Sequence, residues 1–175
     1  MRRISMVLTI LGAVLFSHST HADDTTKRSE ELQVLDRFVG TWDLHVTVKP
    51  AQGDATTEKT SEVRKWSLGG KFVHFENPRE DQPDFPEFHM LVTYDPATKT
   101  YPGILMSGAS RSLVDGNWNQ QTKTMRFTGT FANGSKFDFK NQFLENGDIK
   151  SSGVITDASG KVVLERSDVQ TRRKK

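Results

Sequence analysis

Apolar residues recur along this chain at two different intervals, and the interval changes near residue 40. Between residues 29 and 38 the apolar side chains are three or four positions apart, the spacing of one helix face: Leu32, Leu35 and Phe38. Ser29 is suited to cap the helix start, acidic residues follow in the first turn, and Gly40 is a helix-stop residue. The pattern predicts one short amphipathic helix over residues 29–38.

From Thr41 onward the interval becomes two, which is typical of strands with one buried face. In the first of these runs Trp42 and Leu44 share one face, while His45 lies on the other. Polar loops separate the runs, and Asn-Gly or Ser-Gly pairs at 133–134, 146–147 and 159–160 are strong hairpin signals. We expect strands at 41–48, 60–68, 71–76, 88–94, 101–107, 113–118, 125–131, 137–143, 149–155 and 161–171.

These elements predict an all-β fold, namely a single antiparallel lipocalin-like barrel of about ten strands with one short N-terminal helix. Closure removes the exposed edges that ten antiparallel strands would otherwise present. A barrel of roughly eight strands is just filled by its own side chains, so ten strands are expected to leave internal space.

The first 22 residues have a different character from the rest of the chain. Arg2 and Arg3 precede an apolar run at residues 4–16, and a short polar segment ends at Ala22. This layout predicts a signal peptide over residues 1–22, followed by the barrel domain at 23–175, and therefore an exported protein, periplasmic or extracellular. An uncleaved membrane anchor is the alternative, although the run is short for a membrane span.

Charge and cysteine content narrow the function classes. Cleavage after Ala22 would leave 22 basic and 22 acidic residues, so we expect no nucleic acid partner and no stable membrane insertion. The chain has no cysteine, which excludes disulfides and thiolate chemistry. We expect a monomer or a weak homo-oligomer.

The segment 38–44, Phe-Val-Gly-Thr-Trp-Asp-Leu, resembles the opening of calycin barrels, which include lipocalins, fatty-acid-binding proteins and nitrobindin-like proteins. The wider pattern is similar to an exported bacterial lipocalin-like family known only as a domain of unknown function. The residues that carry this likeness are 38–42, 66–73, 94–101 and 171–172. The resemblance implies the barrel and supplies no activity.

Histidines raise the question of a metal or haem. Nitrobindin-like barrels bind haem through a late histidine, but none follows His89, and the Gly-rich segment that those proteins carry after the first Trp is missing. His45 points away from the predicted interior, which breaks a three-histidine set. His74 and Glu76 share a face, so a two-residue site remains conceivable. Alternation does not reveal which face it is, because Phe72 and Phe75 lie on opposite sides. We expect no metal and no cofactor.

No catalytic motif stands out, so an enzyme is the less expected reading. Serine does not occur in a nucleophile-elbow pattern, and the carboxylates Asp81 and Asp84 lie in a Pro-rich loop where solvation explains them. The function that the sequence favours is binding of a small apolar or amphipathic molecule inside the barrel. The alternative is a barrel with a filled interior that acts as a non-enzymatic interaction or envelope-stress module.

The residues in phase with the apolar faces are the candidate lining of that interior. They are Leu44, Arg64, Trp66, Phe72, Met90, Met106, Phe127, Phe137, Phe139 and Asn141. An inward Arg64 would need a carboxylate from the protein or from a ligand, because an unpaired buried charge is costly. Local bulges that turn Arg64 and Asn141 outward are the alternative.

Two further expectations concern the ends of the barrel. An even number of antiparallel strands places the start of the first beside the end of the last, so Arg172 should lie against Trp42 and close the barrel. The calycin resemblance implies the same contact. The loop at 77–86 is expected to form a flap near one mouth, with Phe85 or Phe88 turned inward, and residues 172–175 are expected to fray.

Overall fold

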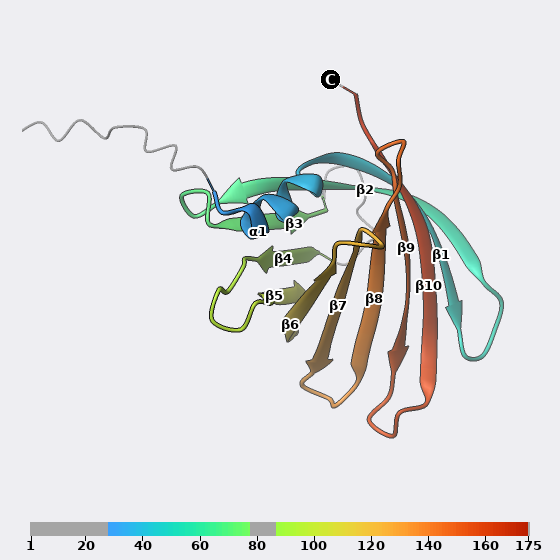
Figure 1. Cartoon of the computed structure of the whole chain (residues 1–175). Coiled ribbons are helices and arrows are strands. Elements are labelled where there is room, and N and C mark those ends of the chain that lie inside the picture. Colours follow the sequence, from blue (N-terminus) through green and yellow to red (C-terminus); the bar gives the residue numbers. More distant parts are fainter. Residues whose placement is uncertain (1–27, 78–86, 175) are drawn as a thin grey trace, which may run out of the picture.

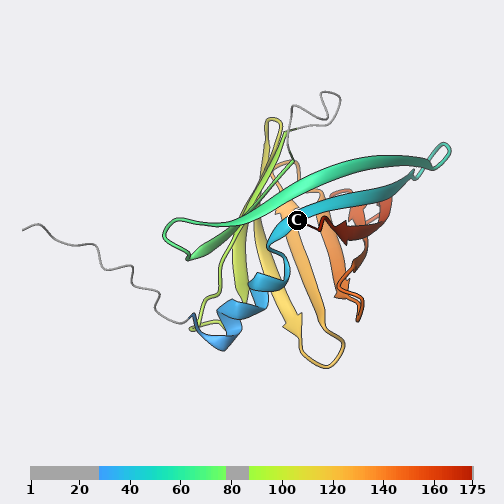
Figure 2. The same ribbon diagram turned by 90° about the horizontal axis from the view of Figure 1, so that it is seen from above.

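The computed structural model describes residues 28–77 and 87–174, and its first element is a short helical segment. It consists of α1 (Glu30–Gln33) and a 3₁₀ turn, η1 (Val34–Arg37). The side-chain oxygen of Ser29 accepts a hydrogen bond from the backbone N–H of Leu32 at 3.2 Å, which satisfies one of the free donors of the first turn. This confirms the single short N-terminal helix, and the segment leads directly into β1 (Figure 2).

Ten strands follow, each antiparallel to its neighbours. They are β1 (Gly40–Pro50), β2 (Thr56–Ser67), β3 (Phe72–Glu76), β4 (Phe88–Val92), β5 (Tyr101–Ser107), β6 (Ser110–Asn119), β7 (Thr124–Phe131), β8 (Lys136–Phe143), β9 (Ile149–Thr156) and β10 (Val162–Arg172). Each strand pairs with the next in sequence, and β1 pairs with β10, so the sheet closes into a barrel (Figure 1). The predicted all-β barrel is confirmed.

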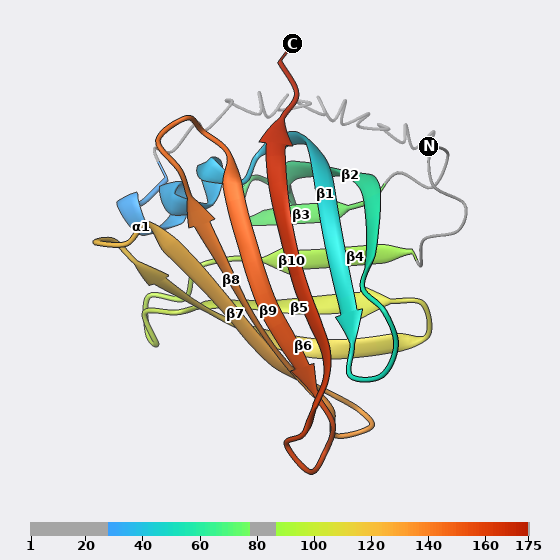
Figure 3. The same ribbon diagram turned by 90° about the vertical axis from the view of Figure 1, so that its right-hand side faces the viewer.

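The barrel wall consists of two sets of strands that cross at a steep angle. β3 to β6 run across the view in Figure 3, whereas β1 and β8 to β10 run nearly upright in front of them. The interior therefore lies between two twisted layers of one continuous sheet, an arrangement in which inward side chains from both layers meet.

Alternation of buried and exposed residues follows the pleat in most strands. In β1 the inward residues Trp42, Leu44 and Val46 are buried, while His45 is exposed. From the helical segment Leu35 and Phe38 reach the same core, and the ring of Phe38 lies 4.8 Å from that of Phe143 and 5.4 Å from that of Phe75. The hydroxyl of Tyr101 donates to the carbonyl of Glu31, which ties the helical segment to β5.

Two of the predicted inward residues face outward. In β3 the buried residues are Val73 and Phe75, so Phe72 lies on the opposite, outer face. In β5 the inward positions include Tyr101 and Leu105, and Met106 is exposed. Both strands carry large apolar residues at consecutive positions, which removes the alternation that sets the register elsewhere.

Several sequence expectations fall on residues that the structure does not describe. Among them are the signal peptide at 1–22 and the loop at 78–86, with Phe85 in it. Phe88, at the start of β4, is inward and packs against the core. Within the described residues no helix is long and apolar enough to cross a membrane.

Candidate ligand-binding site

A cavity lies inside the barrel, between the phenyl rings of β7 and β8 and a group of polar side chains on β2, β9 and β10. The volume of the cavity is about 110 Å³. One water needs roughly 10–15 Å³, so the cavity has room for several waters or a small organic group. It is smaller than the roughly 300–1,000 Å³ typical of sites for drug-sized ligands.

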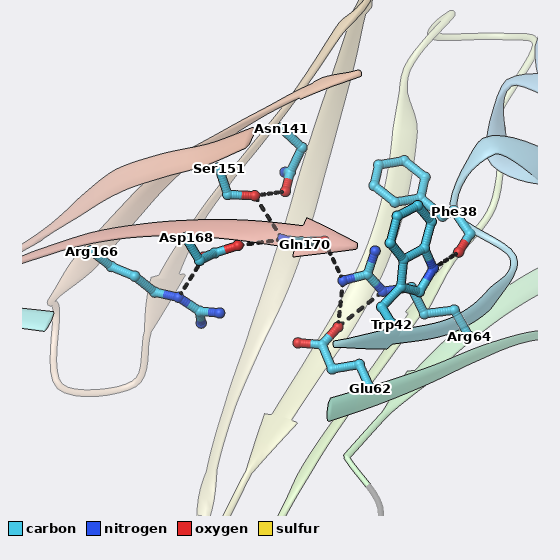
Figure 4. A network of polar contacts seen from close by, with 9 residues as sticks. All are labelled: Phe38, Trp42, Glu62, Arg64, Asn141, Ser151, Arg166, Asp168 and Gln170. Carbon is cyan, nitrogen blue, oxygen red and sulfur yellow. Dashed lines mark hydrogen bonds and ion pairs between the residues drawn. The ribbon is translucent and has the colours of Figure 1, made fainter. Parts of the chain in front are cut away.

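The polar side of the cavity is a connected network of hydrogen bonds (Figure 4). The guanidinium of Arg64 donates to Glu62 Oε2 from Nε at 2.9 Å and from Nη2 at 2.7 Å, and Nη2 also donates to Gln170 Oε1 at 2.6 Å. The amide nitrogen of Gln170 donates to Asp168 at 2.6 Å and to Ser151 at 2.7 Å. Ser151 in turn donates to Asn141 Oδ1 at 2.6 Å.

One buried donor of this network has no partner within residues 28–77 and 87–174. Arg64 is 3% exposed, and its Nη1 makes no hydrogen bond to any described residue. A buried donor left without an acceptor costs about 1–3 kcal/mol, and more when the group is charged. Since Arg64 lines the cavity, an acceptor placed there could relieve this cost.

The charges that line the cavity occur in matched pairs. Glu62 compensates Arg64 at 2.7 Å, and Asp168, whose side chain is 2% exposed, accepts from Nε of Arg166 at 3.0 Å. The lining therefore has two cations and two anions, and it offers a hydrogen-bond donor without an excess of positive charge.

The apolar side of the cavity is organised by glycines that lie opposite phenylalanines on neighbouring strands. Gly129 is paired with Phe137, and Gly153 is paired with Phe139. A Cβ added to Gly129 would lie 2.5 Å from the Phe137 ring, and one added to Gly153 would lie 2.2 Å from Phe139 Cδ1. These rings therefore lie against bare backbone, where an alanine would push them toward the lumen. Gly116 and Phe127 repeat the arrangement.

The structure brings most of the sequence-predicted lining residues together. Those at the cavity are Arg64, Met90, Phe127, Phe137, Phe139 and Asn141. Leu44 is completely buried in the core, and Trp66 is partly buried, with its indole N–H on Asp36 and Arg28 over its ring. Phe72 and Met106 lie on the outer face, as described above.

Sequence reasoning missed five polar members of the network: Glu62, Ser151, Arg166, Asp168 and Gln170. Their strand phase is a usable signal, because each lies two residues from another inward position, as Glu62 does from Arg64. Hydrophobicity alone misses this signal, because it assigns polar residues to the solvent-facing side of a strand even where they point inward.

At the closed end of the barrel the strand pairing places Trp42 opposite Arg172. The guanidinium carbon of Arg172 lies 4.6 Å from the centroid of the Trp42 ring, and its nitrogens donate to the backbone carbonyls of Arg37 and Val39. The indole N–H donates to the carbonyl of Phe38 at 2.6 Å. Burial and the charge of Arg64 lower the pKa of Arg172.

The expectation that residues 172–175 fray is wrong for Arg172, which ends β10, and for Arg173. The backbone N–H of Arg173 donates to Thr41, and its side chain forms an ion pair with Asp43 at 2.7 Å. The chain is therefore held one residue beyond the last strand.

In a comparison with known protein families, residues 27–150 match the family described as "Protein of unknown function (DUF1579)". The chain belongs to this family. No curated protein sequence matches it significantly.

Solved structures resemble this DUF1579 protein in fold. Rv2717c from M. tuberculosis superposes with a TM-score of 0.64 at 11% identity, covering 83% of this chain and 99% of that one. The S-type phycobiliprotein lyase CpeS from Guillardia theta superposes with a TM-score of 0.60 at 11% identity, covering 82% of this chain and 92% of that one. At such identities the likeness is one of fold.

Proposed function

We propose that this barrel binds a small amphipathic molecule in its lumen, with an uncharged polar group of the ligand accepting a hydrogen bond from Arg64. The observation that carries the proposal is the buried Nη1 of Arg64 beside the cavity, which has no hydrogen-bond partner among the described residues. A hydrogen bond to a charged donor contributes about 1.5–3 kcal/mol, which is enough to orient a small ligand.

The size of the cavity supports a ligand, or an inserted part of one, of about one ring. An apolar protein cavity of roughly 150 Å³ binds benzene. The space here is about 110 Å³, flanked by the rings of Phe137 and Phe139 on one side and by Arg64 on another. A flat apolar group can rest against the rings while its polar end meets the guanidinium.

The balanced charges of the lining favour an uncharged acceptor such as a hydroxyl or carbonyl. Glu62 already neutralises Arg64, and Asp168 neutralises Arg166. A carboxylate would have to lose its hydration without meeting an uncompensated cation, which is unfavourable in a buried site.

Three probes with one ring in common test this proposal: toluene, benzyl alcohol and benzoate. NMR titration of the purified protein should show benzyl alcohol binding about ten times more tightly than toluene, since it adds a hydrogen bond to Arg64. Benzoate should bind no more tightly than the alcohol. The variant Glu62→Gln/Arg64→Met removes the donor without leaving an unpaired carboxylate, and it should abolish the difference between benzyl alcohol and toluene.

Extraction of the purified protein followed by mass spectrometry identifies a natural occupant. If the extract is clean and none of the three probes shifts the resonances of Phe137 or Phe139, the lumen is filled. The protein would then act through its outer surface, as an interaction or envelope-stress module.

We also propose that the protein is exported to the periplasm or beyond. The charged start, apolar run and small residue at position 22 support this. N-terminal sequencing of the protein produced in a bacterial host should find Asp23 first, whereas an intact Met1 would contradict cleavage.

A further inference from the structure

Two histidines and two glutamates meet on the outer face of the barrel, away from the lumen. β3 and β4 are neighbours, and Glu76 lies directly opposite His89 in their pairing. His74 shares the face of Glu76, because Val73 and Phe75 occupy the inner face. The side chains of His74, Glu76 and His89 are 20%, 24% and 32% exposed, so an ion can reach them from solvent.

The four side chains form a chain of close contacts. His74 Nε2 lies 3.0 Å from His89 Nδ1, and the two rings are stacked with centroids 5.2 Å apart. The other nitrogen of His89 is 3.1 Å from Glu87 Oε1. The other nitrogen of His74 is 3.5 Å from Glu76 Oε2.

The contacts show where a metal ion could replace a proton. The His74–His89 and His89–Glu87 contacts are hydrogen bonds, whereas His74 Nδ1 and Glu76 Oε2, 3.5 Å apart, form an ion-pair contact only. Two neutral imidazoles bring one proton each, which is enough for the two hydrogen bonds. A metal ion can take the place of the proton between the two rings and leave the hydrogen bond to Glu87 intact.

We propose that His74, Glu76 and His89 bind a divalent transition metal ion, with zinc the best match. The ion lies between His74 Nε2 and His89 Nδ1, which leaves the Nε2 proton of His89 to donate to Glu87. A carboxylate that holds the outer N–H of a ligating histidine is the usual support of such sites. Bound in tetrahedral geometry at about 2.0–2.1 Å, two nitrogens lie roughly 3.3 Å apart, close to the spacing found here.

Glu76 supplies the third ligand atom. The donor atoms of His74, Glu76 and His89 all lie within 4.8 Å of one another, so a small side-chain rotation brings the carboxylate to the ion. Lys65 holds Glu76 Oε1 at 2.6 Å and leaves Oε2 to bind. Two imidazoles and one carboxylate suit zinc, nickel or copper, and they suit magnesium and calcium poorly.

Isothermal titration of the tag-free protein with zinc chloride tests the site. One zinc ion per chain should bind, and magnesium chloride should give no signal. Replacing a ligand, in His74→Asn or His89→Gln, should weaken binding by at least about 100-fold. Glu87→Gln, which removes the carboxylate that supports His89, should weaken it by about 10-fold. Lys65→Gln should strengthen binding, because it removes a competing cation from Glu76.

His45→Gln is the matched control. His45 is exposed on the outer face of β1, and its replacement should leave zinc binding unchanged. Circular dichroism checks that each variant keeps the barrel. Equal zinc affinity in His74→Asn and His45→Gln would overturn the proposal. So would the absence of zinc binding at pH 7.5.

Discussion

The helix-covered end of the barrel and the cavity differ in how their side chains fill space. Around the helical segment Leu35 and Trp42 are completely buried, and the indole N–H of Trp42 is satisfied by a backbone carbonyl. At the cavity the rings of Phe137 and Phe139 border open space, and Arg64 has one nitrogen without a partner in the described part of the chain. The first region is closely packed. The second keeps open space and, among the described residues, a hydrogen-bond donor without an acceptor, which are features of binding sites.

Truncating a ring in each region should separate the two most clearly. Trp42→Ala should lower the free energy of unfolding by about 3–5 kcal/mol, because it opens a void in the fully buried core. Phe139→Ala should cost less, about 1.5–3 kcal/mol, because its ring already borders open space and mainly the transfer free energy is lost. Urea unfolding followed by fluorescence measures both. Equal costs would mean that the two regions are equally well packed.

A second way to probe the difference is to add a methyl group to a glycine in the wall of the cavity. Gly153→Ala should destabilise the barrel by about 1–3 kcal/mol, because the new methyl group would lie 2.2 Å from Phe139 Cδ1 and 2.3 Å from the carbonyl oxygen of Asp138. Ser152→Ala, at the neighbouring exposed position of β9, is the control and should be nearly neutral. The thermal unfolding midpoint reports both, and an unchanged midpoint for Gly153→Ala would show that the rings move aside freely.

The same regions explain how far sequence reasoning reached. In β7 to β9 large apolar residues alternate with polar ones between Asn-Gly turns, so the register follows from the pattern, and Phe127, Phe137 and Ile149 are buried. In β5 the apolar run from Tyr101 to Met106 has no such alternation, and the inward place opposite Val92 is taken by Gly103. Glycine has no side chain, so the hydrophobic pattern cannot show that this position faces inward.

The polar half of the candidate site could be predicted only in part. Arg64 and Asn141 could be recognised as facing inward, because each lies two positions from a large apolar residue of the same strand. Asp168 and Gln170 lie in a strand whose exposed positions include Val162, Val163 and Val169, so hydrophobicity alone points the wrong way there. The pairing of β10 with β1 decides its inner face, and this information is nonlocal.

The smallest expected effect concerns the contact that joins the two ends of the chain. Arg172 lies over the indole of Trp42 and donates to two carbonyls at the end of the helical segment. Arg172→Ala should therefore lower the free energy of unfolding by about 1–2 kcal/mol, since it removes a cation–π contact together with those hydrogen bonds. Arg173→Ala is the matched control: its ion pair with Asp43 is about half exposed on both sides, and such pairs contribute at most about 1 kcal/mol. Urea unfolding at two salt concentrations distinguishes them, because the exposed pair weakens with salt and the contact over the buried indole changes little. Equal and salt-sensitive losses in both variants would show that Arg172 acts as a surface charge and that the Trp42 end is held by packing alone.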